Sequence, residues 1–328
     1  MRIIGTPRRR VDGRAKVTGQ TKFADDVMLP RMVHCKLLRS SMPHARIVRV
    51  DVSRAQARPG VHLVLTGRDF PIPYGILPVS QDEHALAIDR VRFVGDPVAA
   101  VIARDELTAF EALDLIDVEY EPLRTFNDPE ESLAHPEPRI HDYGDSGNIH
   151  KAVSLKFGDI EQAFKDADRV FEDTFFYQGN THLPIEQHAA VAAVDPDGKL
   201  VLWSSTQTPH YVHRALAKAL AMPAAHIRVI ATPNGGGFGG KSDPFNHEMI
   251  VAKAAMILDR PVIDKTGITG RFDIRVEFSR EGTEPASDPT RPPSIFTALQ
   301  EQLGLRLESG RGPVDTLVID RIDRPSDN

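Results

Sequence analysis

The chain has 328 residues, of which 41% are hydrophobic and 26% charged, and its formal net charge is −6 at pH 7. This length suits about two domains with a sizeable core, and the acidic balance excludes a basic surface of the kind that nucleic acids or anionic membranes attract. The single cysteine, Cys35, excludes an internal disulfide and a cysteine-ligated iron–sulfur cluster within this chain. No apolar run approaches the ~18 residues of a membrane span, and none follows the basic start, so we expect a soluble, cytoplasmic protein.

Residues 8–125 have the pattern of an α/β domain. A fully apolar run at 98–103 is typical of a buried strand, and Leu107, Phe110 and Leu113 recur at helical spacing within 105–116. These elements carry enough apolar area for us to expect residues 8–125 to fold as an independent domain. Further strands are predicted at 32–38, 45–50, 61–65 and 117–120.

A polar, proline-rich connector at 126–147 leads into a second α/β region at 148–262. Beyond residue 262 the cationic residues are nearly all arginine, so we treat 263–328 as a separate small α/β tail, with a linker near 281–293 that we expect to be mobile. In the second region, the patterns predict strands at 169–176, 189–194, 199–204 and 227–230, and helices at 160–167, 211–222 and 247–258.

The most informative segment is Asn234-Gly235-Gly236-Gly237-Phe238-Gly239-Gly240-Lys241-Ser242. Five glycines around one phenylalanine disfavour both helix and strand. Between a predicted strand and a predicted helix, such a loop allows backbone N–H groups to approach an anionic or oxo ligand closely. The segment therefore predicts a ligand-binding loop.

One interpretation of this loop is nucleotide binding, because residues 235–242 fit the phosphate-loop pattern G-x-x-x-x-G-K-[ST]. Asp243 and Pro244 oppose it, since they put a negative charge and a proline where the phosphate-holding helix should begin. A P-loop-like nucleotide-binding protein is therefore the alternative function.

A second interpretation is a resemblance that extends well beyond the loop. Several motifs, in the same order, resemble the large subunits of the molybdenum hydroxylases, the family of xanthine dehydrogenase, aldehyde oxidase and 4-hydroxybenzoyl-CoA reductase. The motifs are Arg10-Val11-Asp12-Gly13, Lys16-Val17-Thr18-Gly19, Leu38-Arg39-Ser40, Pro43-His44-Ala45, Val94-Gly95-Asp96-Pro97, Val118-Glu119-Tyr120-Glu121-Pro122, Glu186-Gln187-His188, Ser204-Ser205-Thr206-Gln207 and Gly235-Gly236-Gly237-Phe238-Gly239-Gly240-Lys241.

The resemblance implies an α+β protein, with an α/β hammerhead domain followed by the first part of a molybdopterin-binding α/β domain and the small tail. It implies a molybdenum–pterin cofactor, which needs no protein cysteine and so agrees with the lone Cys35. It places Gln207 beside the apical molybdenum ligand, and the backbone of Gly237, Phe238 and Gly239 against the metal centre, with no metal-ligating side chain. An amide donor and backbone N–H groups would stabilise oxo ligands without adding charge.

The family's reaction would be hydroxylation, or reductive dehydroxylation in the 4-hydroxybenzoyl-CoA reductase branch, of a small aromatic, heterocyclic, aldehyde or acyl-CoA substrate. FAD and 2Fe–2S centres would lie only on partner subunits of the same complex. Ser242 stands where purine-hydroxylating members carry a glutamate, which weighs against xanthine as the substrate.

We expect structural rather than catalytic roles for the other polar residues near these motifs. His182 and His188 flank Glu186 and could ligate a metal, but in this family context we expect them to brace the domain by hydrogen bonds. Lys241 is expected to be solvated or salt-bridged. The expected glutamate base is missing, and the inherited carboxylates Glu186 and Asp243 are not at the family's base position.

The tail has a resemblance of its own. Residues 263–328 resemble the C-terminal module of an uncharacterised soil-bacterial family, through Asp264-Lys265-Thr266-Gly267 and Gly312-Pro313-Val314. Because the family's large subunit is more than twice as long, we expect a truncated subunit that is inactive alone. A non-catalytic remnant that docks partner subunits is a third hypothesis, and the junction at 262/263 is either a gene fusion or an assembly error.

Overall fold

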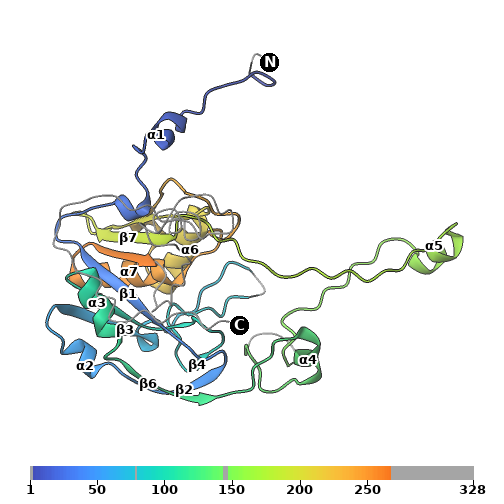
Figure 1. Cartoon of the computed structure of the whole chain (residues 1–328), viewed down its shortest axis with the longest axis horizontal. Helices are drawn as coiled ribbons and strands as arrows, with labels where there is room; N and C mark the ends of the chain where they lie inside the picture. The colour runs from blue at the N-terminus through green and yellow to red at the C-terminus, as the bar shows by residue number, and fades with distance from the viewer. Residues whose placement is uncertain (1–2, 78–79, 143–146, 267–328) are drawn as a thin grey trace, which may run out of the picture. The chain divides into compact units, whose positions relative to one another are not determined.

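The computed structural model describes residues 3–77, 80–142 and 147–266. Most of the regular elements predicted in the first region are present, and each ends within a few residues of its expected position (Figure 1). They are β1 (Val33–Arg39), β2 (Ala45–Asp51), β3 (Val61–Thr66), β5 (Pro97–Ala103), α3 (Glu106–Leu113) and β6 (Asp117–Pro122). Two short elements that were not predicted are α2 (Ser53–Gln56) and β4 (Arg90–Val91).

The strand β5 is buried along its whole length, which explains its unbroken apolar sequence. One face, with Ala100 and Ile102, joins the main core, and the other, with Ala99 and Val101, packs against α3. The helix begins after Asp105, whose carboxylate accepts a hydrogen bond from the Thr108 N–H at 2.7 Å.

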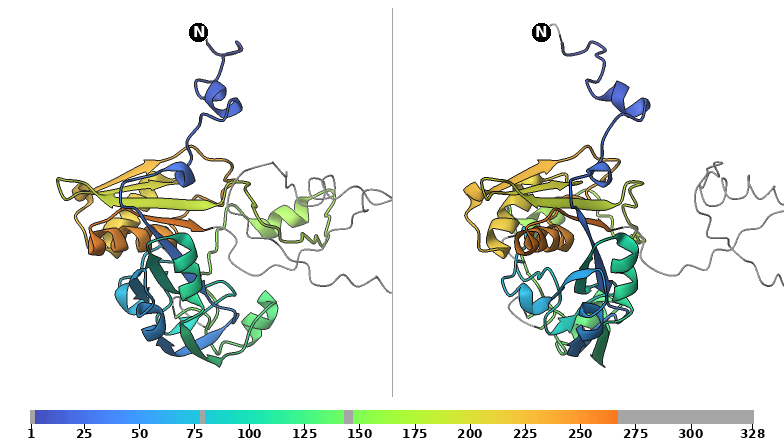
Figure 2. Two further views of the ribbon diagram at one scale, coloured as in Figure 1. Left: turned by 60° about the vertical axis from the view of Figure 1, so that its left-hand side comes forward. Right: turned by 90° about the vertical axis from the view of Figure 1, so that its left-hand side faces the viewer.

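The second region supplies the other half of a seven-stranded sheet in the order β3-β5-β1-β10-β7-β8-β9. The strand β10 lies between the two halves, parallel to β1 and antiparallel to β7. Figure 2 shows α6 and α7 along one face of β7, β8 and β9. The elements of this region are β7 (His188–Val194), β8 (Leu200–Ser204), α6 (Pro209–Ala219), β9 (Ile227–Ala231), α7 (Asn246–Leu258) and β10 (Val262–Thr266).

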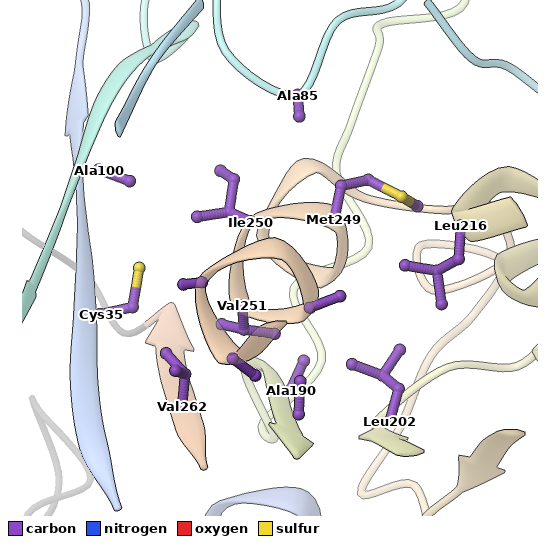
Figure 3. Packing of buried hydrophobic residues seen from close by; sticks show 14 of the residues in the cluster. Cys35, Ala85, Ala100, Ala190, Leu202, Leu216, Met249, Ile250, Val251 and Val262 are labelled. Atoms are coloured by element: carbon purple, nitrogen blue, oxygen red, sulfur yellow. The ribbon is translucent and has the colours of Figure 1, made fainter. Parts of the chain in front are cut away.

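A single main core joins both regions (Figure 3). Cys35 from β1 and Val262 from β10 pack with Ile250 of α7 and with Ala190 of β7. The expectation that residues 8–125 fold independently is therefore weakened, because one face of β1 packs against elements beyond residue 187. The junction at 262/263 stays a prediction. The strand β10 of the main sheet continues past it to Thr266.

Two segments differ from their predicted structure. The strand predicted at 169–176 is wrong, because these residues pair with no strand among those described. The connector at 126–147 contains a short helix, α4 (Pro129–Ala134), capped by the Asp128 carboxylate. Two other short helices are α1 (Gly13–Val17) and α5 (Ile160–Asp166). The linker near 281–293 and the tail beyond residue 266 lie outside the described residues.

Candidate functional site

The glycine-rich loop connects β9 to α7 and has a conformation that few residue types can adopt. Gly236 and Gly239 have φ values of 112° and 89°, in the left-handed region that favours glycine. Phe238 between them also has a positive φ, 51°, and its side chain is 74% exposed. The local sequence thus forces a tight turn in which Phe238 and Gly239 are exposed, Gly236 is half-buried and Gly237 is buried.

Gln207, which follows β8, is tied into this loop. Its backbone N–H donates to the Lys241 carbonyl oxygen at 2.8 Å. Its side-chain Oε1 accepts from the N–H groups of Gly239 and Lys241, both at 3.2 Å, and from the Ser242 hydroxyl at 3.4 Å. Because three donors converge on Oε1, the amide orientation is fixed. The NH₂ group has no acceptor among the described residues and is available to a ligand.

Gly237 must be glycine for this arrangement to exist. A Cβ atom there would lie 2.6 Å from both Cδ and Oε1 of Gln207, far inside contact distance. The N–H groups of Gly236, Gly237 and Phe238 donate to no acceptor in the part of the chain that the structure describes. The structure therefore brings Gln207, Gly237, Phe238 and Gly239 together. The Gly239 N–H is used by Gln207 Oε1, which leaves the Gln207 NH₂ and the N–H groups of 236–238 as a set of uncharged donors. Such a set fits an oxo or other anionic group.

Lys241 is buried beneath the loop. Its side chain is fully buried, and its Nζ lies 2.6 Å from Glu186 Oε2, with the Gln187 carbonyl oxygen at 3.3 Å. The same Glu186 oxygen accepts the Gly235 N–H at 2.7 Å. The interpretation as a phosphate loop is wrong, because the lysine that should reach a phosphate is instead ion-paired inside the protein. Its predicted salt-bridged state is confirmed.

Two histidines near the Lys241–Glu186 pair contact Gly240 of the glycine-rich loop. His188 Nε2 donates to the Gly240 carbonyl oxygen at 3.0 Å, and burial lowers the pKa of this imidazole, so the neutral form is favoured. His182 lies against Gly240, where a Cβ atom would come within 2.8 Å of its Cγ. His188 thus braces the loop by a hydrogen bond, as the sequence predicted, whereas His182 is exposed and makes no hydrogen bond among the described residues.

Sequence reasoning missed that Glu186 anchors both ends of the loop, through Gly235 and Lys241. The local sequence carries no direct signal for this contact, because Glu186 and Lys241 are 55 residues apart in the chain. Glu186 is therefore engaged in an ion pair. The second inherited carboxylate, Asp243, instead lines a separate cavity of about 260 Å³ together with Glu83 and His141. There, burial and nearby Asp243 and Asp82 raise the pKa of Glu83 to about 7.

The comparisons with known proteins agree with this architecture. Residues 18–124 match the aldehyde oxidase and xanthine dehydrogenase a/b hammerhead domain, and residues 140–264 match the molybdopterin cofactor-binding domain. A crystal structure of quinoline 2-oxidoreductase from Pseudomonas putida 86 superposes with a TM-score of 0.72 at 34% identity, over 80% of this chain and 34% of that one. These domains define the α/β architecture of the molybdopterin cofactor-binding large subunits. The chain belongs, through these residues, to the large-subunit family of xanthine dehydrogenase and aldehyde oxidase.

Two relatives show how much of the family is represented. The nicotinate dehydrogenase large molybdopterin subunit of Eubacterium barkeri is 41% identical over 241 residues, which are 74% of this chain and 56% of that protein. A probable xanthine dehydrogenase subunit from Bacillus subtilis is 39% identical over 263 residues, 79% of this chain but 34% of that protein. The chain thus spans about a third to a half of the relatives it matches.

The C-terminal part of the chain matches a different protein family. Residues 212–322 match a family of proteins of unknown function, DUF3738, which overlaps the molybdopterin domain and extends through most of the tail. Among the described residues, no helix is long and apolar enough to cross a membrane.

Proposed function

We propose that this chain forms one wall of a molybdenum–pterin site in an oxidoreductase of the molybdenum hydroxylase type. The observation that carries the proposal is the fixed amide of Gln207, whose Oε1 accepts three hydrogen bonds while its NH₂ group stays available. Beside it, the N–H groups of residues 236–238 add further uncharged donors. When bound, the cofactor would supply two-electron redox chemistry at its metal.

The chain's own residues have positioning roles in this proposal. The NH₂ of Gln207 and the N–H groups of residues 236–238 would hold an oxo ligand, which carries partial negative charge, in a defined orientation. The ion pair between Lys241 and Glu186 would keep the loop in the required shape. The proposed substrate is a small aromatic, heterocyclic, aldehyde or acyl-CoA molecule, and Ser242 in place of a glutamate weighs against xanthine.

Partner subunits are part of the same proposal. The only cysteine, Cys35, is buried in the main core, so an iron–sulfur centre would have to be bound elsewhere. We assign FAD and 2Fe–2S centres to separate subunits that accept the electrons. Neither Glu186 nor Asp243 serves as the catalytic base, so the chain alone would not turn over a substrate.

Molybdate is a suitable probe because it presents molybdenum-bound oxo groups without the pterin. We expect millimolar molybdate to shift the amide NMR signals of Gly236, Gly237 and Phe238 and the side-chain NH₂ of Gln207 in the isolated chain. Gln207→Glu should abolish the response, because the carboxylate still accepts the three loop hydrogen bonds but replaces the NH₂ donor with a negative oxygen.

The matched control is Gln56→Glu, on the exposed side of α2 and distant in sequence from the loop, which adds the same charge. It should leave the molybdate response unchanged. Shifts that are scattered over the surface, or that persist in Gln207→Glu, would contradict the proposed role of the loop.

A further inference from the structure

The cavity that Asp243 lines, of about 260 Å³, lies where segments from both regions of the chain meet. Tyr74 and residues 82–89 come before β4, residues 92–96 form the turn between β4 and β5, and residues 243–246 lead into α7. Tyr74 and Glu83 exchange backbone hydrogen bonds of 2.8 and 3.2 Å, which hold these two residues side by side. We call this space the acidic cavity, because of the side chains that line it.

Carboxylates are in excess around the acidic cavity. The acidic residues of its lining are Asp82, Glu83, Asp89, Asp96 and Asp243. Among the described residues, Arg92 is the only lysine or arginine in that lining, and its Nε donates to the Ile140 carbonyl oxygen at 2.9 Å. Burial raises the pKa of Glu83 to about 7, and the nearby charges of Asp243 and Asp82 contribute. A bound cation would relieve this repulsion, because an opposite charge favours an ionised carboxylate.

Tyr74 provides independent evidence for a ligand. It is only 2% exposed, yet its hydroxyl makes no hydrogen bond with the described residues, whereas buried tyrosine hydroxyls usually have a partner. Its backbone groups are already paired with Glu83, so the hydroxyl is the polar group that Tyr74 offers to the cavity it lines. Burial and the charges of Glu83, Glu248 and Asp96 raise the pKa of this phenol, which therefore stays neutral.

Aromatic rings determine which kind of cation suits the acidic cavity. Tyr74, Phe93 and Phe245 line it together with the carboxylates. A metal ion makes no use of such rings, whereas an organic cation is attracted to their faces and its apolar part packs against them. The volume of about 260 Å³ is just below the ~300–1,000 Å³ of common small-molecule sites. It therefore suits a ligand with a single ring.

We propose that the acidic cavity binds a small aromatic amine in its protonated form. The ammonium group donates to the carboxylates of Glu83 and Asp243, the Tyr74 hydroxyl accepts a further N–H, and the ring packs against Phe93 and Phe245. This inference goes beyond the proposed function, because the molybdenum–pterin proposal uses none of these five side chains.

Calorimetric titration of the full chain with benzylamine at pH 7 tests the proposal. We expect saturable one-to-one binding, and at least tenfold weaker binding of benzyl alcohol, in which a neutral hydroxyl replaces the ammonium group. The double variant Glu83→Gln, Asp243→Asn should bind benzylamine at least tenfold more weakly. Its thermal stability should not fall, because both carboxylates are exposed and repel each other.

Tyr74→Phe removes only the hydroxyl. We expect benzylamine to bind at least threefold more weakly to this variant, while its thermal unfolding is unchanged because the hydroxyl has no partner to lose among the described residues. An affinity equal to that of the original chain would contradict the role of Tyr74 as an acceptor.

The matched control is the double variant Glu161→Gln, Asp197→Asn, which removes two exposed carboxylates outside the cavity lining. It should bind benzylamine as the original chain does. Absence of saturable binding, equal affinity for benzyl alcohol, or equal weakening by both double variants would each overturn the inference. The molybdate response of residues 236–238 is measured separately, so a failure of one proposal leaves the other testable.

Discussion

Lys241 gives the glycine loop its shape through an internal ion pair. With the lysine side chain fully buried and Glu186 nearly so, Lys241→Ala leaves a carboxylate without its cation and should lower the free energy of unfolding by about 3–5 kcal/mol. Urea denaturation monitored at Trp203 would measure this loss. Removing both charges in Lys241→Met, Glu186→Leu should cost far less, because no charge is left unpaired.

The exposed Lys199 provides the comparison for this measurement. Lys199→Ala should change the unfolding free energy by no more than about 0.5 kcal/mol. If Lys241→Ala were equally mild, the pair would have no structural role, and the loop would have to be held by Gln207 and His188.

At the scale of single elements, β10 carries an acidic residue into the centre of a sheet. Asp264 is about 1% exposed, and its Oδ2 has no hydrogen-bond partner among the described residues. Burial raises its pKa to about 7, although Lys36 and Arg39 oppose the shift. In the unfolded chain its pKa is near 3.8. The folded state therefore holds a proton that the unfolded state releases, and stability from this group falls as pH rises from about 4 to about 7.

Asp264→Asn should remove this pH dependence. We expect the variant to gain stability relative to the original chain when the pH is raised from 5 to 8, because the amide stays uncharged. Thermal unfolding at both pH values would reveal the difference. Burial also raises the pKa of Glu248 to about 7, so some decrease of stability with rising pH remains in the variant. The control is Asp197→Asn, in an exposed turn, whose thermal stability should change with pH as that of the original chain does. The same pH dependence in Asp264→Asn would contradict the raised pKa of Asp264.

Local sequence predicted most elements because each has a clear physical signal. The run at 98–103 is apolar at every position since both faces of β5 are buried. The five glycines of 235–240 disfavoured helix and strand, and the structure has neither there. The strand at 169–176 failed because strand propensity needs a neighbouring strand, and the described residues offer none. The role of Glu186 was missed because its contact with Lys241 spans distant parts of the chain.

At the scale of the whole molecule, the shared core predicts how the chain behaves when divided. Cys35 is 1% exposed, and burial raises the pKa of its thiol, so it should react very slowly with a thiol reagent in the full chain. In an excised fragment of residues 8–125, α7 and β10 are missing and one face of β1 is uncovered. We expect the thiol there to react at least a hundredfold faster.

Because Cys35 is the only cysteine, the reaction rate reports on this core without ambiguity. A fragment of residues 8–266 should retain the slow rate of the full chain. Slow reaction in the fragment of residues 8–125, together with a cooperative thermal transition, would restore the view that the first region is an independent domain.

The central position of β10 also fixes when the sheet can be completed during synthesis. Val33 pairs with Val262, near opposite ends of the described chain, so β1 leaves the ribosome long before the strand that will lie beside it. Translation at ~5–20 residues per second leaves that edge of β1 open for ten seconds or more. An unpaired strand edge of this kind is prone to aggregation, and any product released before residue 262 would lack the central strand β10 and should be degraded faster than the full chain.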